Sequence, residues 1–328
     1  MTTVGIIASP TAGKDVRRLV GHAGSTGDVD KIAIIRRAVL GVIESGVEKI
    51  LFLDDTRHLI QRALERISKS EISMEPIMEA VMGNGRDSQK AAAAMKEANV
   101  GSVIVFGGDG TNRDVAKGWI DVPIVPLSVG TNNVFPFHME STIGGIAAGL
   151  VARGIVPLNE VAERAKIIRV DLAGGHNDLA LVDLVLVEGD FIGSRAIWDV
   201  SNLKEGIFAI AEPTAVGLSS IAATLQTIGR DEDGGVYVQM GLGNQTVRAP
   251  IAPGTFETIQ IRNHRKLVLN EPVTITGPGV LAFDGERDYV LSEDENAIAT
   301  ILREGPWVIN TQKAMDLANL NNYFVSSN

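Results

Sequence analysis

One short segment combines residue types that suit phosphate chemistry. It reads Gly107-Gly108-Asp109-Gly110-Thr111-Asn112 and follows the apolar run Ser102–Phe106, where a buried strand is expected to end and a helix over 112–119 to begin. Glycines let a backbone approach a ligand closely, and a helix N-terminus favours an anion. The carboxylate of Asp109 would repel phosphate, so we expect Mg²⁺ between them or a proton taken from an attacking hydroxyl. The alternative is a tight glycine-rich turn.

Two further polar segments follow other expected strands. Gly130-Thr131-Asn132-Asn133 comes after the run Pro123–Leu127, and its small side chains suit hydrogen bonds to a base, a ribose or a phosphate, or a plain turn. Gly13-Lys14 lies in the segment 9–18, whose cations are either an anion site or a solvated helix face.

A late acidic segment, Asp284-Gly285-Glu286, follows the apolar strand expected over Val280–Phe283. Its carboxylates either project from the strand end into a cleft and help the chemistry, or belong to a hairpin turn. Asp-Gly is a favoured pair for a type I′ turn, so the sequence leaves both interpretations open.

Two familiar phosphate-binding fingerprints fail on spacing. A Walker A loop needs G-x-x-x-x-G-K-[ST], and around Gly13-Lys14 the first glycine is replaced by Ala8. The dinucleotide fingerprint G-x-G-x-x-G lacks its third glycine, because Arg113 stands there. If the segment 107–112 binds phosphate, it therefore belongs to a class of loop other than these two.

Composition narrows the class of protein. The chain has 328 residues, which favours two domains, and it has no cysteine, which excludes disulfides and thiolate metal sites. A net charge of −10 argues against nucleic acid as a partner. The longest apolar stretch, Ile143–Leu158, is broken by glycines, Arg153 and Pro157, so we expect no membrane span and a cytoplasmic protein.

The first 137 residues alternate between two periodicities. Apolar runs of strand length cover Val4–Ala8, Lys49–Leu53, Ile77–Met82, Ser102–Phe106 and Pro123–Leu127. Between them lie helical patterns, one of which Gly46 should end and another of which Asp87 or Ser88 should cap. Strand and helix alternating in this way predict an α/β domain with a parallel sheet covered on both faces.

The pattern changes over residues 138–305. After a helix expected at Thr142–Arg153 come short apolar runs punctuated by Pro, Gly, Asn and Asp, which predict an antiparallel, sandwich-like β-rich domain with one helix at 216–229. Separate strands are expected at Val236–Met240 and Thr246–Ile251. A C-terminal helix within about 306–328 is expected to pack back on the first domain, with the active cleft between the two.

Taken together, the motifs resemble the NAD kinase and diacylglycerol kinase superfamily. The Gly-Gly-Asp-Gly-Thr loop, the Gly-Thr-x-Asn turn and the late Asp-Gly-Glu carry the likeness, which spans nearly the whole chain. Arg113-Asp114-Val115 and the Ala-Gly-Lys-Asp opening are most similar to the AcoX branch, the NAD-kinase-like proteins of acetoin-catabolism operons.

The resemblance implies an ATP-dependent kinase that uses Mg²⁺ and transfers the γ-phosphoryl group to a hydroxyl of a small molecule. The likeness to the AcoX branch implies a link to acetoin catabolism. Asp109 would lie at the reacting centre and at the metal, and Asp284 or Glu286 would help as in the lipid branch. The nucleotide would be held by Gly107, Gly108, Gly110, Thr111, Asn112, Thr131, Asn132, Asn133, Gly13, Lys14, Asp183 and Thr214.

Two departures from the family pattern concern the acceptor. Thr214 is among the few residues that match the family's Thr-Pro-Thr-Gly-Ser-Thr segment, and Val182-Asp183 stands where NAD kinases carry an Asn-Glu pair. Valine cannot form the hydrogen bonds of asparagine, so we expect an acceptor smaller and less polar than NAD.

Three alternatives stay open: an NAD kinase proper, a diacylglycerol-type lipid kinase and a nucleotide-binding sensor without turnover. The lipid kinase would favour a basic amphipathic stretch, which the sequence does not offer. The superfamily and the many strand edges also imply a homo-oligomer, a dimer or a tetramer.

Overall fold

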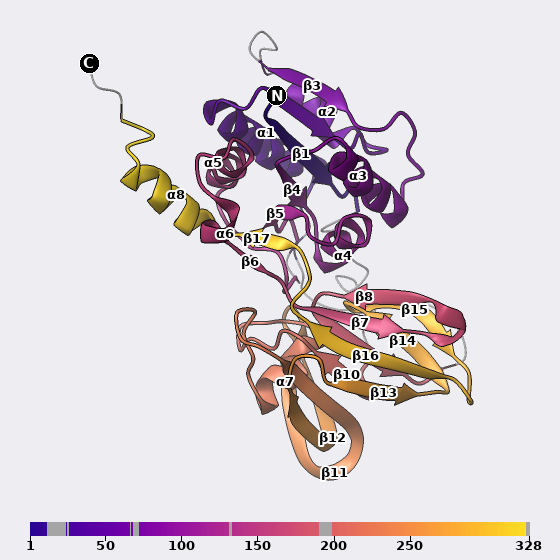
Figure 1. Ribbon diagram of the computed structural model, residues 1–328. Helices are drawn as coiled ribbons and strands as arrows, with labels where there is room; N and C mark the ends of the chain where they lie inside the picture. Colours follow the sequence, from indigo (N-terminus) through magenta and orange to yellow (C-terminus); the bar gives the residue numbers. More distant parts are fainter. Residues whose placement is uncertain are drawn as a thin grey trace.

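A computed structural model describes residues 1–11, 24, 26–65, 67, 72–130, 133–189 and 199–325. Figure 1 shows an α/β part above a β-rich part, joined at β6 and β17. The chain enters the β-rich part after β6 and leaves it before β17, so the two parts are connected twice.

The α/β part is built on one seven-stranded sheet. In spatial order its strands are β3 (Ser73–Pro76), β2 (Lys49–Phe52), β1 (Thr3–Ala8), β4 (Ser102–Phe106), β5 (Pro123–Leu127), β17 (Trp307–Ile309) and β6 (Ala162–Arg164). All neighbours are parallel except β17 and β6. The predicted parallel sheet is confirmed, with one antiparallel strand at its edge.

Helices cover both faces of this sheet (Figure 1). Strand residues alternate between two apolar cores, so Ile104 packs under one set of helices and Val105 under the other. The first set is α1 (Asp28–Glu44), α2 (Leu59–Leu64), α5 (Ser141–Ala152), α6 (Leu158–Val161) and α8 (Thr311–Leu320). The second set is α3 (Gly85–Glu97) and α4 (Asp109–Gly118).

Three local expectations for this part are wrong. The third strand is Ser73–Pro76 rather than 77–82, because it is a polar edge strand that carries no apolar run. The cap of α3 is Asn84, and Asp87 is its capping-box partner three residues later. Helix α4 begins at Asp109 rather than at residue 112. Gly46 does follow the end of α1, with a φ of +75°.

The β-rich part stacks two antiparallel sheets. The larger has the order β12 (Thr255–Leu267), β11 (Gly235–Ala252), β10 (Leu203–Phe208), β9 (Asp183–Val187), β14 (Gly279–Phe283) and β15 (Glu286–Leu291). The smaller has the order β13 (Pro272–Thr276), β16 (Asn296–Leu302), β7 (Ile167–Asp171) and β8 (Asn177–Ala180). A short 3-10 turn, η2 (Ala173–Gly175), joins β7 to β8. One core lies between the sheets, and the other lies under α7 (Ser219–Leu225).

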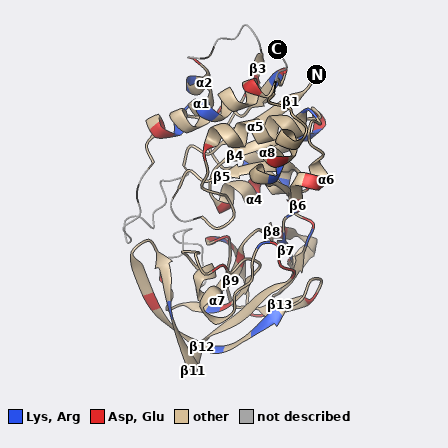
Figure 2. Ribbon diagram, turned by 90° about the vertical axis from the view of Figure 1, so that its left-hand side faces the viewer, with Lys and Arg blue, Asp and Glu red and all other residues tan. Residues whose placement is uncertain are grey.

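The predicted antiparallel β-rich region is confirmed, but two of its details differ. The strands expected at 236–240 and 246–251 form one long strand, β11, with a bulge between Met240 and Gln245. Helix α7 is shorter than the expected 216–229. Figure 2, turned by 90°, shows β11 and β12 as a long hairpin at the bottom of the molecule.

The segment between residues 138 and 164 lies with the α/β part. Helix α5 packs on α1, and β6 extends the first sheet. Helix α8 contacts α5 and α6, and the Tyr323 hydroxyl donates to the Ser45 carbonyl at 2.9 Å. We therefore propose a boundary between the two parts near Ala165, later than the predicted residue 137. Within the described ranges no helix is both long and apolar enough to cross a membrane.

Two neighbouring glycines of α5 give a matched test of the α1–α5 contact. A Cβ on Gly145 would lie 2.0 Å from the Ala38 carbonyl oxygen, whereas a Cβ on Gly144 would meet the Leu127 side chain at 3.4 Å. We expect Gly145→Ala to lower the free energy of unfolding by about 1–3 kcal/mol through overpacking. Gly144→Ala should be neutral or stabilising, because alanine favours helix over glycine. Urea unfolding of both variants checks this, and equal midpoints would contradict the close helix approach.

Candidate active site

The Gly107–Thr111 loop joins β4 to α4 and supplies the first turn of that helix. Gly108 is the N-cap residue, and the first intrahelical bond runs from the Asn112 amide to its carbonyl at 3.2 Å. The amides of Gly110 and Thr111 precede that bond, so they have no acceptor within the helix. Both residues line a cleft, where their N–H groups and the helix dipole suit an anion.

The two leading glycines are required by close packing. A Cβ on Gly107 would lie 2.5 Å from the Thr111 Cβ, and a Cβ on Gly108 would lie 2.6 Å from the Asn133 Oδ1. Both distances are shorter than real Cβ contacts. The turn therefore brings the loop against the segment after β5, as the sequence motifs suggest but cannot show.

Asp109 is held by that neighbouring segment. Its carboxylate accepts hydrogen bonds from the Val134 amide at 3.0 Å and from the Phe135 amide at 2.8 Å. Asn133 also lies at the cleft and donates to the Ser128 hydroxyl at 2.9 Å. Two backbone donors fix the direction of the Asp109 carboxylate within the cleft wall. The candidates Gly13, Lys14, Thr131 and Asn132 lie outside the described residues.

The side chain of Asn112 stabilises the loop on the side away from the cleft. Its side-chain Nδ2 donates a second hydrogen bond to the Gly108 carbonyl, at 2.8 Å, and the side chain is fully buried. Neither Asn112 nor Gly107 is among the described residues that line the cleft. Their contacts fit support of the turn rather than contact with a ligand.

Asp284 and Gly285 form the turn of the β14–β15 hairpin. Their φ angles are +51° and +76°, the two positive values that a type I′ turn needs. The buried Asp284 carboxylate accepts from the Leu181 amide at 3.0 Å and from the Val182 amide at 2.8 Å. Burial raises the pKa of Asp284, and the nearby Arg113 guanidinium opposes the shift. This geometry anchors the hairpin to β9.

Val182 and Asp183 take part in the same anchor. The Asp183 carboxylate accepts from the Gly285 amide at 3.2 Å, and Val182 packs in a core that both parts of the chain share. Neither residue lies among the described residues lining the cleft, and the exposed Thr214 is also absent from that lining. Their assignment to nucleotide binding stays a prediction.

Glu286 comes directly after the turn and faces the Gly107–Thr111 loop. A Cβ on Gly110 would lie 3.4 Å from the Glu286 Oε1, and the glutamate side chain is 41% exposed. The hairpin turn thus presents a carboxylate to the opposite wall of the cleft. The two interpretations of Asp-Gly-Glu are compatible, because the first two residues make the turn and the third lines the cleft.

Two cations of α4 connect this helix to the β-rich part. The Arg113 guanidinium donates to the Phe283 carbonyl at 2.8 Å and to the Asp288 carboxylate at 3.1 Å, and only 5% of its side chain is exposed. One turn later the Lys117 ammonium pairs with Asp178 at 2.7 Å. Neither Arg113 nor Lys117 was predicted as a site residue, although two cations four residues apart directly after the loop were a usable signal.

The cleft has a volume of about 1090 Å³ and is lined by both parts of the chain. Among the described residues, carboxylates outnumber cations in its lining. The carboxylates are Asp55, Asp87, Asp109, Asp114, Asp178, Asp284, Glu286 and Asp288, and the cations are Arg86, Arg113 and Lys117. A bare polyphosphate would be repelled by such a wall, so a bound nucleotide needs cations of its own.

The donors in the cleft fit magnesium carried by a nucleotide. In the part of the chain that the structure describes, no group of three or more His, Asp or Glu side chains is arranged to hold a metal. Mg²⁺ in kinase sites is bound by one or two carboxylates together with substrate phosphates and water. Asp109 and Glu286, on facing walls beside the loop amides, match that sparse arrangement.

Comparisons with known proteins show the family of the chain. The ATP-NAD kinase N-terminal domain matches residues 4–155, and the Acetoin catabolism protein X C-terminal domain matches residues 166–304. Fold and loop together define a protein of the NAD-kinase-like class. Acetoin catabolism protein X from Cupriavidus necator is 35% identical in an alignment 312 residues long, which covers 91% of this chain and 87% of that protein. The chain belongs to the acetoin catabolism protein X family.

A solved structure supports the fold alone. The crystal structure of yeast NADH kinase complexed with NADH superposes with a TM-score of 0.52 at 11% sequence identity. The alignment covers 100% of this chain and 89% of the yeast chain. The two-part architecture is thus similar to that of the yeast enzyme, although few residues are identical.

The titration of Asp114 gives a test of the cleft wall. This residue packs against the first turn of α3, where a Cβ on Gly85 would lie 2.1 Å from its Oδ2. Burial raises the pKa of Asp114 to about 6, against the opposing charges of Arg113 and Lys117. The unfolded value is about 3.9, so ionisation of Asp114 costs stability above pH 6 and this cost disappears as the pH falls towards 4.

Asp114→Asn should therefore stabilise the fold at pH 7.5 by about 1–3 kcal/mol relative to the parent, at roughly 1.4 kcal/mol for each pKa unit. The advantage should shrink through pH 6 and vanish near pH 4. Urea unfolding of both proteins at matched pH values measures it. A difference that stays constant over this range would show that Asp114 titrates at an ordinary value.

Proposed function

We propose that the chain is an ATP-dependent kinase that transfers the γ-phosphoryl group to a hydroxyl of a small molecule. The observation that carries the proposal is the juxtaposition of Glu286 with the Gly110 loop across one cleft. One wall offers backbone amides and a helix N-terminus for phosphates, and the other offers a carboxylate. Family membership supports the same class of reaction.

Each residue has a role that follows from its contacts. The Gly110 and Thr111 amides bind phosphate oxygens, and Asp109, whose direction is fixed by two amides, takes the proton of the attacking hydroxyl. Glu286 orients the acceptor or holds the metal from the facing wall. When bound, Mg²⁺ supplies neutralisation of phosphate charge, which phosphoryl transfer requires more than covalent catalysis.

The acceptor we propose is a short hydroxylated molecule rather than NAD. Val182 is buried in the core between the two parts, and Asp183 holds the hairpin turn. At the positions that we align with the family's Asn-Glu pair, these side chains are thus engaged within the protein. The kinship to an acetoin catabolism protein favours small hydroxyketones and polyols as the first acceptors to assay.

The decisive variant is Asp109→Asn. It keeps the size of the side chain but removes its negative charge, so we expect kcat to fall by about 10²–10⁴-fold with a small change in the KM for MgATP. The assay follows ATP turnover with a panel of hydroxyketones, polyols and NAD. Asp121→Asn, an exposed carboxylate of the same part of the chain, is the matched control.

Three results of this assay would contradict the proposal or its acceptor assignment. A near-normal rate for Asp109→Asn would reduce Asp109 to a turn residue, and no turnover with any acceptor would favour a nucleotide-binding sensor. If NAD is phosphorylated with kcat/KM near 10⁴ M⁻¹s⁻¹ or above, the acceptor assignment is wrong and the chain is an NAD kinase.

The expected dimer or tetramer remains part of the proposal. The two sheets of the β-rich part end in β12 and β15 and in β13 and β8, and unpaired strand edges are usually covered. Light scattering at micromolar concentration tests it, and a monomer would remove the idea.

A further inference from the structure

One peptide group of the active-site wall is held by opposite charges at its two ends. The N–H of Phe135 donates to the Asp109 Oδ1 at 2.8 Å, and the carbonyl of Val134, in the same peptide unit, accepts from the Arg230 Nη2 at 2.8 Å. From this we infer that Arg230 is a positioning residue, which sets the direction of the Asp109 carboxylate through the backbone of 134–135. The catalytic half of this inference rests on the proposed kinase function.

Arg230 is well fixed for such a role. Its Nη1 donates to the Phe135 carbonyl at 3.1 Å, so two successive carbonyls are bound by one guanidinium. The Glu212 carboxylate accepts from the Nε at 3.1 Å and from the Nη2 at 3.3 Å, and the guanidinium lies 4.3 Å from the centre of the Phe137 ring. Only a planar fork with several donors can make all these contacts, so lysine is a poor substitute.

The peptide group between Val134 and Phe135 links the position of the Arg230 guanidinium to that of the Asp109 carboxylate. A hydrogen bond at its oxygen strengthens the donor at its nitrogen, because bonds in a chain polarise one another. The cation of Arg230 thus supports the bond that the Asp109 anion receives. Without Arg230 the Val134 and Phe135 carbonyls lose their charged donor, and the segment that carries the two amides loses a fixed position.

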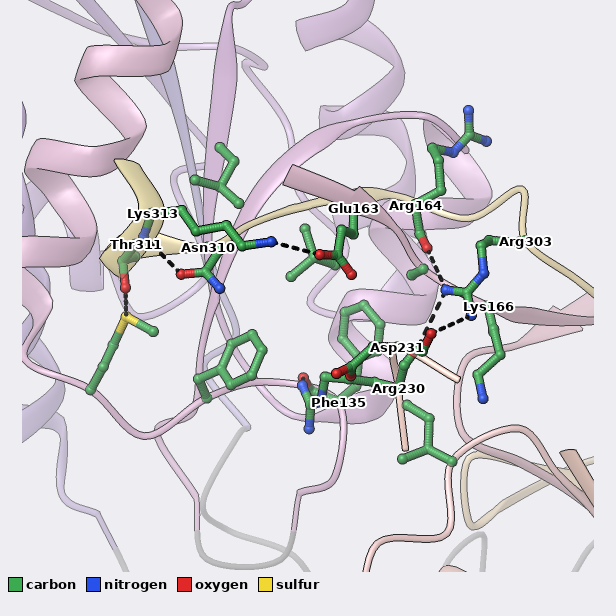
Figure 3. A pocket seen from close by; sticks show the side chains of 16 residues that line it. Phe135, Glu163, Arg164, Lys166, Arg230, Asp231, Arg303, Asn310, Thr311 and Lys313 are labelled. Carbon is green, nitrogen blue, oxygen red and sulfur yellow. Dashed lines mark hydrogen bonds and ion pairs between the residues drawn. The ribbon is translucent and has the colours of Figure 1, made fainter. Parts of the chain in front are cut away.

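The turn that presents Arg230 is itself tied to the junction of the two parts (Figure 3). The Lys166 ammonium donates to the Gly229 carbonyl at 2.8 Å and to the Gly234 carbonyl at 3.1 Å. The Arg303 guanidinium donates to the Arg230 carbonyl at 3.3 Å and to the Asp231 carbonyl at 3.2 Å.

Lys166 and Arg303 stand where the chain enters and leaves the β-rich part. Together with Arg230 and the buried Phe135 they line a second cavity of about 410 Å³. A chain of contacts therefore runs from the interdomain junction through the 229–234 turn to Arg230, and from Arg230 through one peptide group to Asp109.

The test compares Arg230→Gln, Arg230→Lys and Glu212→Gln in the full chain. Lys313→Gln is the control, because Lys313 lines the same cavity but pairs with Glu163, and both side chains are more than half exposed. The first readout is hydrogen exchange of the peptide segment containing Val134 and Phe135. The second is kcat and KM for MgATP with whichever acceptor is turned over.

We expect exchange at 134–135 to accelerate about tenfold or more in Arg230→Gln, less in Arg230→Lys and Glu212→Gln, and not at all in Lys313→Gln. The kcat should fall about 10–100-fold with KM changed less than about threefold, since misplacing a reacting group by 1 Å costs about that much. The lysine variant, which keeps the charge, should recover part of the loss.

Unchanged exchange at 134–135 in Arg230→Gln would overturn the inference, and so would a normal kcat in an active enzyme. Exchange does not depend on turnover. If the parent protein phosphorylates no acceptor, the proposed function fails, while exchange alone still decides whether Arg230 positions the segment. If Arg230→Gln does not fold, Arg230→Lys and Glu212→Gln give the same comparison.

Discussion

The geometry of the cleft depends on the buried guanidinium of Arg113. The buried guanidinium donates hydrogen bonds to the Phe283 carbonyl and to the Asp288 carboxylate. Burial alone would lower the pKa of Arg113, but the nearby Asp284 and Asp288 carboxylates raise it. Replacing Arg113 by a neutral residue would leave the buried Phe283 carbonyl and the Asp288 carboxylate without this donor, which destabilises the contact between the two parts. Arg113 lies four residues after Asp109 on the same helix, so the contact fixes the loop and the hairpin relative to each other.

Both parts of the chain contribute to the cleft. The α/β part offers amides at a helix N-terminus, which favour phosphate, and beside them the carboxylate of Asp109. The β-rich part offers Glu286 after a rigid turn, and through Arg230 it also supports the segment that directs Asp109. The β-rich part therefore contacts the loop at Gly110 through Glu286, and it contacts the segment that binds Asp109 through Arg230. The site is complete only when both parts are in place.

The sequence predicted the fold well where burial leaves a clear pattern. Strands such as Ser102–Phe106 are covered on both faces, so they are continuous apolar runs with nearly correct bounds. The edge strand β3 was misplaced because none of its residues is fully buried and it contains no apolar run. The bulge that makes β11 one strand instead of two leaves no signal in composition, since it depends on the register with β12.

Local motifs predicted the loop but not the contacts that position it. Gly108, Asp109 and Glu286 were found because they belong to short segments with a definite chemistry. Arg113 and Arg230 were not, since their partners lie far along the chain and no periodicity relates them. Asp284 was identified as a residue of interest, yet its use as a buried anchor for β9 depends on a pairing that only the fold reveals.

The most direct test of this account is a crystal structure of the protein with Mg²⁺ and a non-hydrolysable ATP analogue. The account predicts phosphate oxygens at about 3 Å from the Gly110 and Thr111 amides. It also predicts the metal between those phosphates and the Asp109 or Glu286 carboxylate. A nucleotide bound away from this loop, for example in the cavity beside Arg303, would contradict it.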